Sequence, residues 1–137
     1  MTDEVFTPEK LAALMRETIG PSFDAADLAE TLGDGSVVRH AQTTAGVEIG
    51  MRQHVVDTLV AAGCGQQTAL LGIVALLSVP THLPALRALR DLGAILAQRA
   101  GPGAHIVMAA QRRPSESANS VLDLWVRPAP ERRNTKS

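Results

Sequence analysis

Two segments near the start of the chain carry apolar residues at helical spacing. The segment 7–18 begins with Thr7-Pro8-Glu9, where a hydroxyl, a proline and an acid form a typical helix start. The segment 25–32 follows Asp24, whose side chain can cap a helix N-terminus. We therefore expect a short helical lead before the first strand.

Two longer helical patterns follow. One opens at Pro84, places leucines on one face and ends at Gly101-Pro102-Gly103. The other runs through Val56–Leu77, although each glycine inside it weakens a helix by about 1 kcal/mol relative to alanine. The segment 46–54 before it has no clean period, so the sequence predicts a loop there.

Three segments have the pattern of β-strands. Ser36–Arg39 contains two valines and follows a glycine-rich turn. Ala104–Ala110 is almost continuously apolar, which is typical of a strand buried on both faces. Val121–Arg127 alternates between two sets of residues and is stopped by Pro128, so it predicts a half-buried strand at a sheet edge.

This order of elements predicts an α/β fold, with a small, mostly parallel sheet flanked by helices and a short N-terminal helical lead. In this arrangement Ser36–Arg39 is central and Val121–Arg127 lies at an edge. The alternative is a mostly helical chain with a C-terminal β-hairpin. In either case we expect a single domain over 1–130 and a mobile, charged tail over 131–137.

Composition narrows the functional classes. The 137 residues carry a formal net charge of −1 and only 2% aromatic residues, which argues against a nucleic-acid partner. The single cysteine excludes an intrachain disulfide and favours a reducing, cytoplasmic setting. The longest apolar run, Ala69–Val79, is too short to span a bilayer, so no membrane partner is expected. No cofactor is indicated either, and the oligomeric state stays open.

The candidate chemistry lies where the first strand runs into Arg39-His40, followed by small and polar residues. A guanidinium beside an imidazole at the end of a strand could hold a phosphate next to a nucleophilic nitrogen. A surface arginine and histidine after an ordinary strand would give the same pattern.

The sequence Val38–Thr43 resembles the Arg-His signature of the histidine phosphatase superfamily, and the resemblance extends in order from about Ala25 to Pro128. It implies hydrolysis of a phosphomonoester or phosphohistidine through a phosphohistidine on His40. Arg39 would bind the phosphate, and Gln42 or Thr43 would donate a hydrogen bond to it. The partner would be a phosphorylated small molecule or a phosphoprotein.

The second half of such a site departs from the family pattern. No second phosphate-binding arginine is present in Ser78–Leu83, and Ala110 stands where the second catalytic histidine belongs. Gln111 and Arg112 are the residues left to compensate. The resemblance therefore implies weak turnover, and two alternatives stay open: a non-catalytic relative of the phosphatases, or a helical protein–protein interaction module with no active site.

Other motifs are weaker. Gly63–Thr68 is similar to a phosphate-binding loop, but Gln66 replaces the lysine that the loop requires. Gly103–Ser115 is similar to a strand of FtsK-type DNA translocases, without the Walker lysine. His40, His54 and His82 share no helical or strand spacing, so no metal site is predicted.

Overall fold

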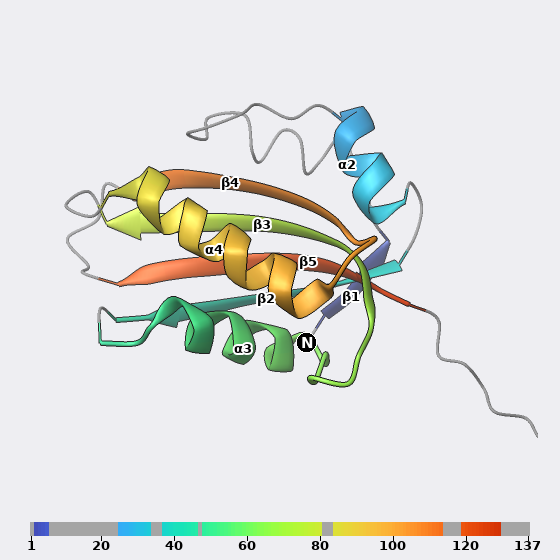
Figure 1. Cartoon of the computed structure of the whole chain (residues 1–137), viewed down its shortest axis with the longest axis horizontal. Helices are drawn as coiled ribbons and strands as arrows, with labels where there is room; N and C mark the ends of the chain where they lie inside the picture. Colours follow the sequence, from blue (N-terminus) through green and yellow to red (C-terminus); the bar gives the residue numbers. More distant parts are fainter. Residues whose placement is uncertain are drawn as a thin grey trace, which may run out of the picture.

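A five-stranded mixed sheet forms the centre of the chain in the computed structural model (Figure 1). The structure describes residues 2–5, 25–33, 37–46, 48–80, 84–113 and 119–129. In chain order its elements are β1 (Thr2–Val5), α2 (Ala25–Leu32), β2 (Val37–Ala45), α3 (Met51–Ala61), β3 (Leu70–Pro80), α4 (Ala85–Ala100), β4 (His105–Arg113) and β5 (Ser120–Pro128).

The strands lie in the order β1-β2-β5-β3-β4. Among the hydrogen-bonded pairs of strands only β3 and β4 are parallel, and α4 forms the crossover between them. The pairs β1/β2, β2/β5 and β5/β3 are antiparallel. Because β5 runs against both of its neighbours, β2 and β3 point in the same direction and end at the same end of the sheet.

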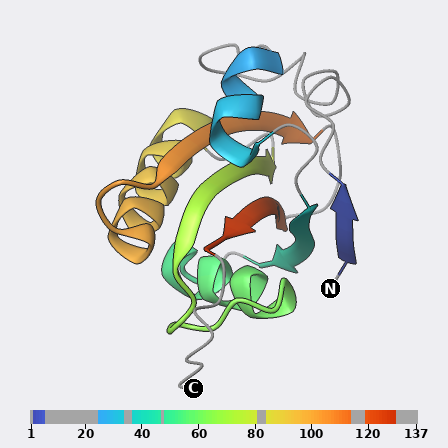
Figure 2. The same ribbon diagram turned by 90° about the vertical axis from the view of Figure 1, so that its right-hand side faces the viewer.

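The sheet has an apolar core on each face. Figure 2 shows α2 apart from α3 and α4. On one face α3 and α4 pack against alternate β3 residues such as Ile73 and Leu77, and Leu59 and Leu92 are fully enclosed there. On the other face α2 packs its leucines against a smaller cluster. That second cluster comprises Leu28, Leu32, Val38, Val74, Leu76, Val107, Ala109 and Trp125.

The helix predicted through Val56–Leu77 is wrong in its second half. Helix α3 ends at Ala61, and Leu70–Pro80 is the strand β3. Ten of the eleven residues of β3 are buried, because helices or side chains cover both faces of this strand. A strand buried on both sides loses its apolar–polar alternation, and its apolar run then satisfies a helical period by chance. The predicted loop over 46–54 is also shorter, because α3 begins at Met51.

The predicted α/β class, with a small sheet flanked by helices, is confirmed. The sheet is mixed rather than mostly parallel, and the predicted edge position of Val121–Arg127 is wrong. Val121–Arg127 belongs to β5, which lies between β2 and β3, whereas β1 and β4 form the edges. Ser36–Arg39 overlaps β2, which lies inside the sheet between β1 and β5 as predicted and continues to Ala45. The mostly helical alternative is excluded.

The helices with one clear apolar face were predicted correctly. Residues 25–32 form α2, and the helix after Pro84 is α4, which ends at Gly101 with a φ of 80° that favours glycine. The predicted helix over 7–18 and the tail 131–137 lie outside the described residues. None of the described helices combines the length and the apolar character needed to cross a membrane.

The contact between α2 and β3 leaves no room for a side chain at Gly72. A Cβ at this position would collide with the backbone carbonyl of Thr31, and the register of β3 against β5 shifts at this point. We expect Gly72→Ala to lower the free energy of unfolding by about 1–3 kcal/mol, because the backbone must move to relieve the overlap. Urea denaturation followed by circular dichroism measures the change.

Gly65→Ala is the matched control, since a Cβ at Gly65 has no neighbour within 4 Å. Its effect should stay within about 0.5 kcal/mol. Equal stabilities of the two variants would contradict the close approach of α2 to β3.

Candidate functional site

Four side chains from β2 and β5 gather on the sheet face that also carries α2. His40 lies opposite Trp125 and Gln42 lies opposite Asp123 in the antiparallel register of the two strands. Since alternate residues of a strand share a face, these two cross-strand pairs stand next to each other on one side of the sheet.

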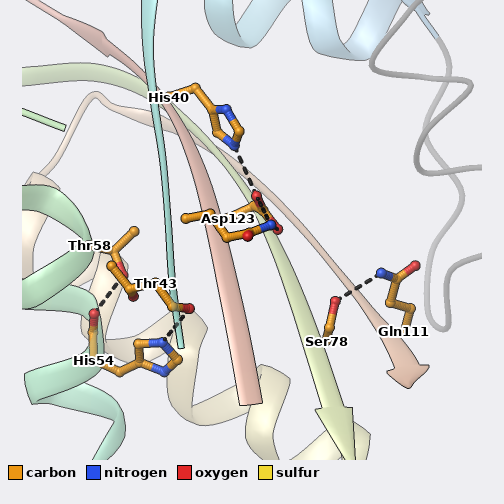
Figure 3. A network of polar contacts seen from close by, with 8 residues as sticks. His40, Thr43, His54, Thr58, Ser78, Gln111 and Asp123 are labelled. Carbon is orange, nitrogen blue, oxygen red and sulfur yellow. Dashed lines mark hydrogen bonds and ion pairs between the residues drawn. The ribbon is translucent and has the colours of Figure 1, made fainter. Parts of the chain in front are cut away.

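The carboxylate of Asp123 is the centre of this cluster (Figure 3). His40 Nε2 lies 2.9 Å from Oδ1, and Gln42 Nε2 donates to Oδ1 and Oδ2 at 3.0 and 3.2 Å. The side chain of Asp123 is only 10% exposed, so these hydrogen bonds replace much of the water that a carboxylate requires. A carboxylate can only accept, which fixes the orientation of both donors.

Trp125 holds His40 from a second direction. The imidazole and indole rings are stacked, with their centroids 4.5 Å apart and an angle of 3° between their planes. Trp125 is buried and belongs to the α2-side core. The imidazole therefore has both its ring plane and its Nε2 atom fixed by β5.

A cavity of about 520 Å³ opens beside this cluster. On its far side Gln111 of β4 donates a hydrogen bond of 2.8 Å to Ser78 of β3. We call this space the polar cavity. Its lining residues are His40, Gln42, Thr44, Leu76, Ser78, Gln111, Val121, Asp123 and Trp125.

No serine or threonine hydroxyl among the described lining residues lies within hydrogen-bond reach of His40. A carboxylate that orients an imidazole suits general-base chemistry, but the base also needs a nucleophile within hydrogen-bond reach. Ser78 lies two strands from His40 and four residues further along β3 than Val74, which is level with Trp125. This register separates Ser78 from His40 by roughly 13 Å along the strands and about 10 Å across them.

The predicted site residues do not converge as expected. His40 and Gln42 meet at Asp123, whereas Arg39 and Thr43 point to the α3 side of the sheet. Arg39 donates to the carbonyl of Gly63 at 3.1 Å, and Thr43 Oγ1 lies 2.6 Å from Thr58 Oγ1. Neighbours in a strand face opposite sides, so Arg39 and His40 cannot bind the same phosphate.

The residues expected to compensate lie on β4, which is not adjacent to β2. Gln111 lines the polar cavity at a distance from His40, and the side chain of Arg112 lies outside the described part of the structure. Among the other histidines, His54 is buried with Nε2 3.2 Å from the carbonyl of Thr43, and His82 is not described. Across the described residues no three histidine, cysteine, aspartate or glutamate side chains are grouped to hold a metal ion.

Asp123 and Trp125 were missed as site residues because an edge strand would expose them to solvent. The signal was present in the sequence, since both residues lie at alternate positions of one strand and therefore share a face. An aspartate inside an otherwise apolar strand predicts a buried carboxylate with partners. The phosphate-loop alternative also has the wrong context, because Gly63–Thr68 connects a helix to a strand and not a strand to a helix.

Comparison with known proteins identifies the fold. No protein-family model matches the sequence, and no curated protein matches it significantly. Two structures of FtsZ from M. jannaschii, an empty dimer and a tryptophan-to-tyrosine mutant, are similar with TM-scores of 0.67 and 0.70 at 14% and 16% identity. They cover 88% and 87% of this chain, which corresponds to 35% and 36% of FtsZ.

A GTPγS-bound protofilament of CetZ2 from Haloferax volcanii is similar with a TM-score of 0.54 at 12% identity, over 92% of this chain and 39% of CetZ2. At such identities the likeness concerns the fold alone, and this chain spans little more than a third of each structure. The histidine phosphatase hypothesis is therefore wrong. Hydrolysis through a phosphohistidine on His40 and a phosphorylated partner lose their basis with it.

The hydrogen bond between His40 and Asp123 should couple the two residues energetically. In a double-mutant cycle of His40→Ala and Asp123→Ala, followed by urea denaturation, we expect a coupling of about 1–3 kcal/mol, because a buried charged acceptor loses its donor. The control cycle uses Gln53 and Asp57, an exposed pair on α3 joined at 2.7 Å. Its coupling should be about 0.2–0.5 kcal/mol. Equal couplings in the two cycles would contradict the central role of Asp123.

Proposed function

We propose that this domain acts by self-association and forms head-to-tail oligomers. The observation that carries the proposal is the fold likeness to structures solved as a dimer and as a protofilament, over 88% and 92% of this chain. Nucleotide binding is left out of the proposal, because the chain corresponds to about a third of those structures and Gln66 replaces the lysine of a phosphate-binding loop.

The two ends of the sheet supply surfaces suited to such contacts. At the end where β2 and β3 finish, Ile49 is 38% exposed and Leu86 is 64% exposed. We call this the forward end. At the opposite end, where α3 finishes and β3 begins, Val60 is 62% exposed and Leu71 is 38% exposed. We call this the rear end.

Two exposed apolar side chains at each of two opposite ends provide the surfaces for a heterologous contact, in which the forward end of one copy meets the rear end of the next. Such contacts generate open chains when no rotation closes them into a ring. Association would remove the four exposed apolar side chains from water and so gain hydrophobic free energy.

Sedimentation velocity over a wide range of protein concentration tests the proposal. We expect the wild type to form oligomers that lengthen with concentration. Leu86→Glu at the forward end and Val60→Glu at the rear end should each weaken association at least tenfold, about 1.4 kcal/mol, because each places an unpaired charge in the contact. Ala94→Glu, at an exposed position in the middle of α4, adds the same charge away from both ends and should assemble like the wild type.

Mixing the two end variants separates the head-to-tail arrangement from a symmetric one. Each variant keeps one intact end. At a concentration where neither variant associates by itself, an equimolar mixture of the two should therefore form dimers. A wild type that is monomeric at all concentrations would overturn the proposal. Unimpaired dimers of either end variant alone would also overturn it, because they indicate a contact between like ends.

A further inference from the structure

Three side chains that line the polar cavity use hydrogen-bond donors within the protein. Gln42 donates through Nε2 to Asp123, and His40 directs its Nε2 hydrogen to the same carboxylate. Gln111 donates through Nε2 to Ser78. Each of these residues keeps an acceptor: Oε1 of the two glutamines and, in the neutral imidazole, the Nδ1 lone pair. Among the described residues nothing donates to these three acceptors.

The charge of the polar cavity, like its acceptors, favours a ligand that donates hydrogen bonds. Among the described residues that line it, Asp123 is the one with a formal charge, apart from His40 when protonated, and none is a lysine or arginine. Within the described part of the chain, no lysine or arginine contacts the Asp123 carboxylate. A nine-tenths-buried carboxylate of this kind favours a cation and disfavours phosphate or another anion.

We propose that the polar cavity binds a guanidinium group, carried by a small molecule or by an arginine side chain of a partner protein. A guanidinium offers five donors in one plane and no acceptor, which complements a carboxylate surrounded by amide oxygens and hydroxyls. The volume of about 520 Å³ exceeds the needs of a single ion, so the cavity also has room for the chain that carries the group. This proposal is independent of self-association, because it uses none of the four end residues.

Trp125 provides a direct readout of binding, because it is the only tryptophan in a chain that has no tyrosine, and it lines the cavity. Titration with N-acetyl-argininamide at low salt should change its fluorescence in a saturable way. N-acetyl-citrullinamide, which replaces the guanidinium by a neutral urea of the same shape, should bind at least tenfold more weakly. Inorganic phosphate should have no effect.

Two variants test the role of charge. Asp123→Asn should weaken binding of N-acetyl-argininamide at least tenfold. Because this variant also disturbs a buried network, Thr44→Glu is used beside it: Thr44 is an exposed lining residue, and a second carboxylate there should tighten binding severalfold. Gln67→Glu, in an exposed turn away from the cavity, adds the same charge and should leave binding unchanged.

A short arginine-containing peptide and its citrulline counterpart distinguish the two sources of the group. Tighter binding of the arginine peptide than of N-acetyl-argininamide indicates a protein partner, and equal or weaker binding indicates a small molecule. Equal affinity for arginine and citrulline compounds, saturable binding of phosphate, or no response to any guanidinium compound would overturn the proposal. So would a Thr44→Glu variant that binds no better than Gln67→Glu.

Discussion

The position of β5 between β2 and β3 is the constraint on which the rest of the structure depends. This strand pairs along both of its edges, with β2 on one side and β3 on the other. Its pairing gives β2 and β3 the same direction, and it places Asp123 between Gln42 of β2 and Leu76 of β3. Without β5 in the interior, His40 and Gln42 would have no common acceptor. The strands β2 and β3 would also not be held in the same direction, which is what brings their ends together at the forward end.

Sequence patterns predicted the helices that have one buried face and one face exposed to solvent. Helices α2 and α4 have such faces, and both were located correctly. Strand β3 was not, because burial on both sides removes the alternation that identifies a strand. The strand order could not be read from the sequence either, since it is set by contacts between β5 and segments more than 40 residues earlier.

The candidate site was likewise predicted only in part. His40 and Gln42 were singled out and do share a face, because they are two residues apart in a strand. Arg39 was placed with His40 on the basis of adjacency in the chain, whereas a pleated strand sends neighbours to opposite sides. Asp123 came from a distant strand whose position was unknown, so the partner that organises the site was out of reach. The resemblance to histidine phosphatases followed the order of elements from about Ala25 to Pro128, but its site chemistry rested on the Arg39-His40 motif. A short motif carries little information when the strand order around it differs.

Crosslinking between copies is the most direct test of head-to-tail assembly through the forward and rear ends. In a Cys64→Ala background, which removes the native thiol, Leu86→Cys and Val60→Cys are made singly and together and treated with a short thiol-reactive crosslinker. We expect a ladder of oligomers for the chain that carries both cysteines. We also expect dimers for an equimolar mixture of the single variants, and no crosslinked dimer for either single variant alone. Dimers of one single variant by itself, or no ladder from the double variant at concentrations where the protein is assembled, would contradict head-to-tail assembly.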